Sequence, residues 1–265
     1  MTPNTRAAFT RCLVLGIGLL GLSATALAAE TVRYVALVDG GKQAGQQLVT
    51  RGDDGKTTVE FIFKDNGRGP ELKEEFTLAA DGTYQTYRSQ GTTTFGAKVD
   101  ETFSRNGDQA QWKTTSDDGR QAVSGTALYS ALGGTPESFS VAINALSRRS
   151  DGKLPLIPNG TLTSRKVATA RVECGKSPRD VELYAVTGVG LTPTFAWATT
   201  GDNPRLFAYI YPGYLQLVED GCQADGNALE ARQKQAESQA LVDLAKRLGH
   251  PLAGATLITN ARVFD

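Results

Sequence analysis

The sequence predicts a mainly β protein: an antiparallel meander sheet, forming a sandwich or a partly open barrel, with one short helix and a C-terminal linker helix. Three observations predict this fold. Apolar and polar residues alternate over short runs, Asp-Gly and Asn-Gly pairs separate those runs, and the 265 residues include 29 glycines. Asp-Gly and Asn-Gly tolerate the positive φ angles of tight hairpin turns, so short antiparallel strands are expected.

The first 28 residues have the composition of a secretory signal peptide. Arg6 and Arg11 precede the apolar run "CLVLGIGLLGLSATALAA", and Ala26-Leu27-Ala28 supplies a small-x-small cleavage pattern. The alternative is a membrane anchor, but the apolar run is short and broken by glycines. We therefore predict removal of residues 1–28, a periplasmic or secreted location of the bacterial export type, and no membrane span afterwards.

Residues 31–123 alternate strand and turn. In "KTTVEFIFK" Val59, Phe61 and Phe63 fall on one side of an extended chain, and the run ends at Asp65-Asn66-Gly67. Such alternation predicts a sheet with one face buried and the other in water. Strand composition returns between residues 161 and 219, so residues 29–224 are predicted to form one β-rich domain.

Two segments have helical periodicity. Thr135-Pro136-Glu137 offers a capping hydroxyl, a first-turn proline and an early acid, and the following apolar residues recur at helical spacing. Residues 225–250 carry a narrow apolar stripe and end at a glycine, which predicts a polar linker helix of about six turns. The last segment, residues 251–265, returns to period two and predicts a final strand.

The charge balance and the single histidine limit the possible functions. With 28 basic and 28 acidic residues, no electrostatic footprint for nucleic acid is present. His250, the one histidine, follows the linker helix, and the sequence contains no G-x-S-x-G motif whose serine it could activate. No catalytic, cofactor-binding or metal-binding residue is predicted in this chain.

Cys174 and Cys222 are the two cysteines left after signal removal. An even number in an exported protein favours one disulfide. The alternative is a reactive thiol or a metal ligand, but no C-x-x-C motif is present.

Five aromatic residues in the second half could line a ligand groove. The same residue types fill strand cores, so a core role is the alternative. The candidates are Tyr184, Phe195, Trp197, Phe207 and Tyr209.

The terminal sequence "TLITNARVFD" resembles the opening strand of the metal-dependent amidohydrolase superfamily. The preceding residues, including "LYAVTGVGLTPTFAWATTGDNPRLFAYI", resemble the N-terminal extension of exported bacterial amidohydrolases. The resemblance implies that residues 251–265 begin a catalytic domain that this chain lacks. The family's His-x-His pair has no counterpart here, so a divalent metal such as zinc is expected only in that downstream domain.

Two functional hypotheses follow. The first is a non-catalytic accessory domain of an exported amidohydrolase, an enzyme class that hydrolyses C–N bonds other than peptide bonds. Its partner would be the catalytic domain in cis, and the chain would be truncated. The alternative is a free-standing periplasmic β-module that binds an apolar or peptide-like ligand.

Overall fold

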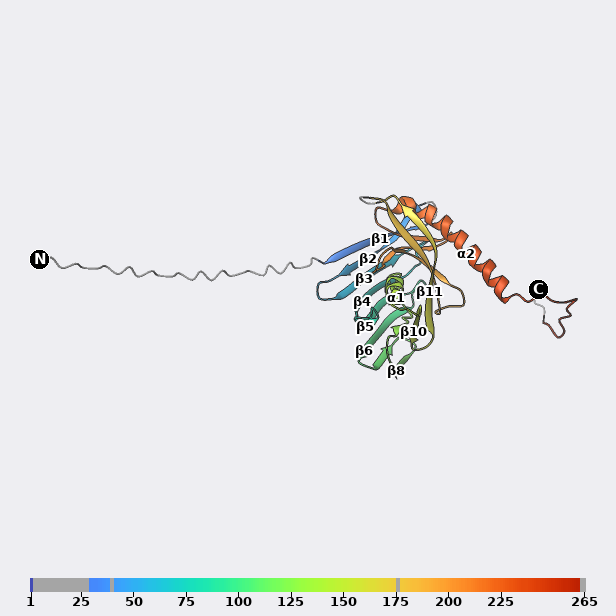
Figure 1. Ribbon diagram of the computed structural model, residues 1–265, viewed down its shortest axis with the longest axis horizontal. Coiled ribbons are helices and arrows are strands. Elements are labelled where there is room, and N and C mark those ends of the chain that lie inside the picture. The colour runs from blue at the N-terminus through green and yellow to red at the C-terminus, as the bar shows by residue number, and fades with distance from the viewer. Residues whose placement is uncertain (2–28, 39–40, 175–176, 263–265) are drawn as a thin grey trace.

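The computed structural model describes Met1 and residues 29–38, 41–174 and 177–262 (Figure 1). The predicted signal peptide, apart from Met1, lies outside the described residues. The same holds for the last three residues of the predicted terminal strand.

The protein is built on one sheet of 15 strands, which is open because its edge strands β8 and β9 do not pair. The order across the sheet is β8-β7-β6-β5-β4-β3-β2-β1-β15-β14-β13-β12-β11-β10-β9. Neighbours are antiparallel except β9 and β10. The prediction of a mainly β protein built on an antiparallel meander sheet is confirmed. The strands are β1 (Glu30–Val38), β2 (Lys42–Arg51), β3 (Lys56–Phe63), β4 (Glu71–Leu78), β5 (Tyr84–Thr92), β6 (Lys98–Asn106), β7 (Gln109–Lys113), β8 (Asp118–Ala122), β9 (Leu128–Tyr129), β10 (Lys153–Ile157), β11 (Thr161–Val172), β12 (Arg179–Thr187), β13 (Thr194–Thr199), β14 (Leu206–Tyr211) and β15 (Leu215–Glu219).

The alternating pattern sets which face of each strand is buried. In β3, Val59, Phe61 and Phe63 are buried and the residues between them are exposed. The turn after β3 contains Asn66 and Gly67 at φ 48° and 75°, the left-handed region that these two residue types tolerate. The turn chemistry read from the sequence therefore places the hairpins correctly.

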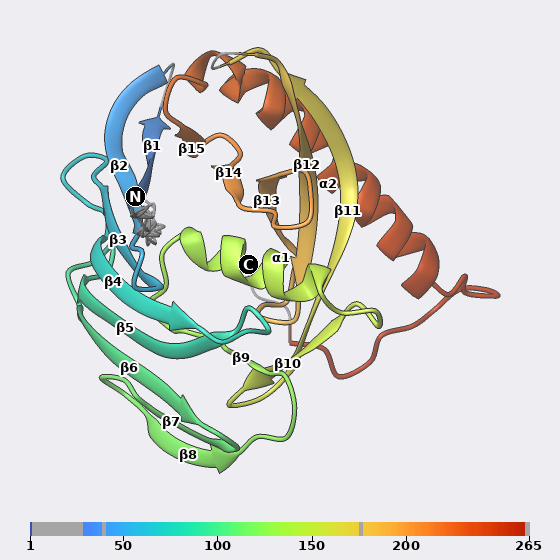
Figure 2. The same cartoon turned by 60° about the vertical axis from the view of Figure 1, so that its left-hand side comes forward.

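The helix α1 (Glu137–Ser147) lies inside the curve of the sheet (Figure 2). Ile143 and Leu146 are buried in the main hydrophobic core, and Phe139 packs partly buried against it. The predicted short helix is confirmed, and its apolar stripe fills the concave side of the sheet.

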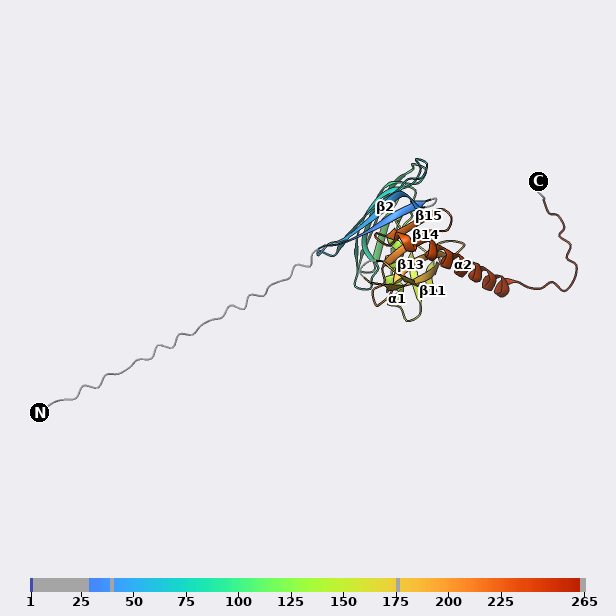
Figure 3. The same ribbon diagram turned by 90° about the horizontal axis from the view of Figure 1, so that it is seen from above.

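The helix α2 (Gly226–Leu248) covers the other face of the sheet, beside β11 and β15. It follows a short 3-10 helix, Gln223–Asp225. Leu229 and Ala236 pack on a second core that includes Trp197 and Phe207. The C-terminal half of α2 extends past the sheet (Figures 1 and 3). The predicted C-terminal helix is confirmed.

Residues 251–262, the described part of the terminal segment, form no strand and are exposed. The strand predicted from their alternation is therefore not formed here. The physical reason is that a strand needs partners for its backbone groups, and this segment pairs with no described strand.

Candidate ligand groove beneath helix α2

A buried carboxylate on the inner face of the sheet holds the loop that leads into α1. Glu74 in β4 is 3% exposed. It accepts hydrogen bonds from the Thr135 backbone N–H at 2.5 Å, the Thr135 hydroxyl at 2.9 Å and the Tyr87 hydroxyl at 2.9 Å. Burial raises the pKa of Glu74 from 4.5 to about 7, against the lowering effect of these hydrogen bonds.

A second buried carboxylate, Glu101 in β6, binds the same loop. It accepts from the Tyr129 hydroxyl at 2.7 Å and from the backbone N–H groups of Leu132 at 3.0 Å and Gly133 at 2.9 Å. Between the two carboxylates, the Ser89 hydroxyl donates to the Gly133 carbonyl at 3.1 Å. Glu74, Ser89 and Glu101 are thus occupied in fixing the loop before α1 to the sheet, which is a structural role.

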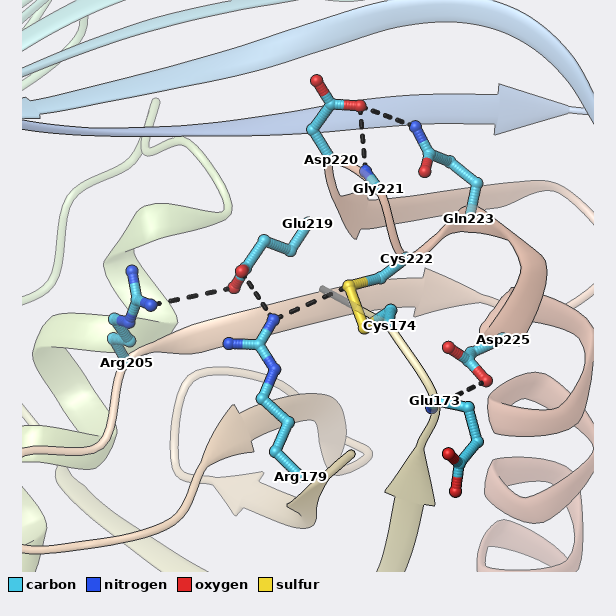
Figure 4. Close-up of a disulfide and its surroundings, with 10 residues drawn as sticks. All are labelled: Glu173, Cys174, Arg179, Arg205, Glu219, Asp220, Gly221, Cys222, Gln223 and Asp225. Carbon is cyan, nitrogen blue, oxygen red and sulfur yellow. Dashed lines mark hydrogen bonds and ion pairs between the residues drawn. A yellow bond between two sulfur atoms is a disulfide. The ribbon is translucent and has the colours of Figure 1, made fainter. Parts of the chain in front are cut away.

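Cys174 and Cys222 form a disulfide, as predicted (Figure 4). The bond ties the chain just after β11 to the turn before α2. Beside it, Arg179 donates to Glu219 at 2.5 Å and to the Cys222 Sγ at 3.6 Å. The disulfide and this ion pair fix the N-terminal end of α2 to the sheet.

A groove of about 820 Å³ lies between the C-terminal half of α2 and the strands β12–β14. We call it the α2 groove. Its α2 wall combines three apolar residues, Ala240, Leu241 and Leu244, with four polar or charged ones. Its lining residues are Arg165, Thr187, Thr192, Pro193, Thr194, Phe195, Tyr209, Ile210, Tyr211, Pro212, Gln233, Glu237, Ala240, Leu241, Asp243, Leu244 and Arg247.

The groove lies where the register pairing of two neighbouring strands, β13 and β14, stops. The pairing of β13 with β14 joins Ala198 to Leu206 and Trp197 to Ala208, and no register pair follows in the described sheet. The backbone N–H and C=O groups of a strand point alternately to its two neighbours, so those of Ala208 and Ile210, two residues apart in β14, point to the same side. The Ile210 carbonyl therefore points into the gap, where it accepts from Gln233 Nε2 at 2.9 Å.

Gln233 is the only α2 residue of the groove that is fully buried, at 1% exposed. Its Nε2 also donates to Glu237 at 2.8 Å. Its Oε1 has no hydrogen-bond partner among the described residues. A buried amide oxygen without a donor is costly, so an N–H or O–H group that reached this atom from the groove would relieve that cost.

The charges of the groove balance. Arg165 and Arg247 are basic, and Glu237 and Asp243 are acidic. All but the half-buried Glu237 are exposed. Two charges of each sign favour a ligand that is neutral overall.

The structure divides the five predicted groove aromatics among three environments. Phe195 lines the α2 groove and belongs to the outer core. Tyr209 also borders the groove, but its ring packs on the main core at the opposite face, where it stacks on Phe139 of α1 with the ring centroids 5.3 Å apart, and burial raises the pKa of its hydroxyl. Trp197 and Phe207 are 0% exposed beneath α2, so neither can line a surface groove, and for them the core alternative is correct. Tyr184 packs partly buried against the main core on the opposite face and donates to Glu182 at 2.6 Å.

The α2 wall of the groove was missed by the sequence analysis. Gln233, Leu241 and Leu244 lie on one side of the predicted linker helix, at spacings of eight and three residues. The sequence does indicate this wall: the apolar stripe continues to the end of the helix, and no other predicted element packs against its last turns.

Two features are absent from the residues that the structure describes. They contain no group of three or more His, Cys, Asp or Glu side chains placed to hold a metal ion. No helix among them is both long and apolar enough to cross a membrane.

Comparisons with known proteins give a likeness to solved structures but none in sequence. No protein-family model matches the chain, and no curated protein matches it significantly. A solved structure that it is similar to is a beta-barrel-like protein of domain of unknown function DUF1849 from Brucella abortus. The two share 12% sequence identity with a TM-score of 0.46, over 72% of this chain and 94% of that chain. We draw no functional conclusion from this likeness.

Proposed function

We propose that this protein is a non-catalytic binding module that holds an apolar, peptide-like ligand in the α2 groove. The observation that carries the proposal is the α2 groove with Gln233 among its lining residues, a buried side chain whose Oε1 has no hydrogen-bond partner among the described residues. A peptide brings N–H donors at regular intervals and side chains for the apolar wall. Carbohydrates and nucleotides match the neutral, leucine-lined wall less well.

The size and composition of the groove support this proposal. Its volume of about 820 Å³ lies within the range of about 300–1,000 Å³ that is common for ligand sites. Such sites combine mostly apolar walls with a few fixed polar groups, as the leucines and Gln233 do here.

We further propose that the protein works outside the cytoplasm. The disulfide between Cys174 and Cys222 supports this, because disulfides persist mainly in oxidising compartments. Detection of the mature chain in a periplasmic or secreted fraction, cleaved after residue 28, tests this proposal.

The binding proposal is tested with a fluorescein-labelled octapeptide of alternating leucine and threonine, measured by fluorescence anisotropy with the full chain. The double variant Leu241→Ser and Leu244→Ser removes the apolar wall at positions that are 61% and 37% exposed. We expect at least a tenfold loss of affinity. Val242→Ser is the matched control, because Val242 is 46% exposed on α2 and does not line the groove.

Equal affinities for the native chain, the double variant and the control contradict a specific site in the groove. No saturable binding of this octapeptide, or of a panel of neutral octapeptides with other apolar residues, contradicts the proposed function.

A second proposal keeps the accessory-domain hypothesis, in which the partner is an amidohydrolase catalytic domain in cis. Its support is the resemblance of residues 256–265 to that family's first strand, together with the exposed end of α2. Sequencing the gene downstream of the Asp265 codon tests it. A continuing or shifted frame that encodes a His-x-His pair is expected, and a clean intergenic region contradicts it.

A further inference from the structure

We propose that the protein has a second ligand site on the concave side of the sheet, and that this site binds a proline-rich peptide in the polyproline II conformation. The site is a cleft of about 580 Å³, which we call the inner cleft. It is walled by α1, the loop before α1, β3 and the hairpin of β14 and β15, and it does not depend on the function proposed for the α2 groove. Its lining residues are Phe61, Phe63, Pro70, Thr94, Ala131, Leu132, Gly134, Thr135, Pro136, Ser138, Phe139, Tyr209, Tyr211, Tyr214 and Leu215.

Aromatic rings from three parts of the fold line the inner cleft. Tyr214 meets the Phe63 ring edge-on, with the ring centroids 5.6 Å apart and the planes at 80°. It also meets the Tyr211 ring edge-on, with the centroids 6.0 Å apart. Phe139 of α1 stacks on Tyr209 of β14 at 5.3 Å. These contacts join β3, α1 and the β14–β15 hairpin, so the aromatic walls hold one another in place before a ligand binds.

The loop before α1 supplies a further wall, and buried carboxylates hold it. Leu132, Gly134 and Thr135 line the inner cleft from this loop. Glu101 accepts a hydrogen bond from the Leu132 backbone N–H at 3.0 Å, and Glu74 accepts one from the Thr135 backbone N–H at 2.5 Å. A site whose walls are already fixed orders fewer of its own groups on binding, which lowers the free-energy cost of association.

The polar side chains of the inner cleft are all hydroxyls. Among the described residues that line it, none is charged and none has a side-chain amide. Ligands with phosphate or carboxylate groups match this lining poorly, because such groups are bound mainly by basic side chains. The ligand that the lining favours is therefore uncharged, presents apolar surface to aromatic rings and offers acceptors to hydroxyl groups.

A proline-rich peptide has these properties. Proline has a backbone carbonyl but no N–H, so it brings an acceptor for the hydroxyls and no donor that must be satisfied. Aromatic-lined grooves bind such peptides repeatedly, because the polyproline II helix is formed before binding. This helix has three residues per turn, so prolines at i and i+3 face the same wall about 9 Å apart. Tyr211 and Tyr214 are 59% and 43% exposed, so a peptide at the surface can contact both.

Fluorescence anisotropy of the full chain with a fluorescein-labelled peptide of ten prolines, decaproline, tests the inference. The double variant Leu132→Ser/Tyr214→Ser removes an apolar side chain from the loop and a ring from the hairpin, and neither residue lines the α2 groove. Leu132 is 72% exposed, so Leu132→Ser alone disturbs the fold least. Leu191→Ser is the matched control, because Leu191 is fully exposed and lines neither site.

We expect saturable binding of decaproline, with a loss of affinity of at least about tenfold in the double variant and about threefold in Leu132→Ser. Leu191→Ser should leave the affinity unchanged. A labelled decapeptide of glycine and serine should bind at least about tenfold more weakly than decaproline does. No saturable binding of decaproline up to about 1 mM overturns the inference. Equal affinities of the native chain, the cleft variants and the control overturn it as well.

Two further outcomes identify a different occupant and also overturn the inference. If the native chain sediments with phosphatidylcholine vesicles but does not bind decaproline, and the double variant does not sediment, the exposed side chains of the cleft bind a lipid surface. If the leucine–threonine octapeptide displaces decaproline, the two peptides share the α2 groove. Binding of decaproline as expected, with no binding of any octapeptide of the panel, supports the inner cleft and contradicts the proposed function alone.

Discussion

Glu74 accepts two hydrogen bonds from Thr135, one from its backbone N–H at 2.5 Å and one from its hydroxyl at 2.9 Å. The two residues are 61 positions apart in the chain. This contact fixes the start of α1 to the inner face of β4. It also places an ionisable group where it is almost fully buried.

The stability of the protein should fall as the pH rises from about 4.5 to about 7. Burial raises the pKa of Glu74 from 4.5 to about 7, so the folded state binds a proton that the unfolded state has released. The stabilisation from this proton is complete below the unfolded pKa and is lost as the pH rises through the folded pKa. Between pH 5 and 8 the loss is roughly 2–3 kcal/mol.

Glu74→Gln should remove this pH dependence, because the amide cannot ionise and still offers an oxygen to Thr135 and Tyr87. Urea denaturation at pH 5 and pH 8 gives the difference for each variant. Glu75→Gln serves as control, since the carboxylate of Glu75, the next residue along the strand, is 53% exposed on the other face of β4. If Glu74→Gln retains the full difference, another group is responsible for it.

The ion pair between Arg51 and Glu137 should contribute more to the stability of the fold than an exposed ion pair does. Arg51 Nη2 and Glu137 Oε1 are 2.6 Å apart, and the Glu137 side chain is 2% exposed and the Arg51 side chain 29% exposed. Arg51→Met leaves a buried carboxylate without its cation, which typically costs about 3–5 kcal/mol, here near the lower end because Arg51 reaches water. Thermal denaturation at pH 7 measures the loss.

Arg33→Met is the control for that variant. Its ion pair with Asp220 spans 3.8 Å, with both side chains nearly half exposed, so its loss should cost less than about 1 kcal/mol. Equal effects of the two variants contradict a special role for the buried pair.

Removal of the disulfide by Cys174→Ala/Cys222→Ala should lower the stability by about 4 kcal/mol. The bond closes a loop with a sequence separation of 48 residues, and in the chain-entropy model a loop of that length is worth about this much. Equilibrium denaturation of the oxidised native protein and the variant measures the difference. If the native protein has the same stability in its reduced and oxidised forms, this prediction is wrong.

The strands and turns of this fold could be predicted from the sequence because their signals are local. The Asn66-Gly67 pair marks its hairpin by itself, and α1 and α2 follow from their apolar spacing. The open edge of the sheet could not be predicted. It depends on which strands meet across the whole chain, as β1 and β15 do.

The candidate site was only partly predictable for a related reason. Phe195 and Trp197 lie two residues apart in β13 and belong to the same outer core, yet only Phe195 lines the groove. The position of α2 over β13 determines which of these two side chains lines the groove. The role of Gln233 likewise depends on a carbonyl in β14 that lies 23 residues away in sequence.

Gln233→Leu should separate the polar contribution of the groove from its apolar one. The leucine keeps most of the side-chain volume but has no acceptor for the ligand and no donor for Ile210. We expect the octapeptide affinity to fall about tenfold, which corresponds to about 1.4 kcal/mol, a typical value for one hydrogen bond. Gln235→Leu, an exposed position on α2 that does not line the groove, should leave the affinity unchanged. Anisotropy titration gives the affinity, and circular dichroism verifies that both variants are folded. If Gln233→Leu binds as tightly as the native chain while Leu241→Ser/Leu244→Ser binds weakly, the groove holds its ligand by apolar contact alone, and Gln233 serves only to close the gap between β13 and β14.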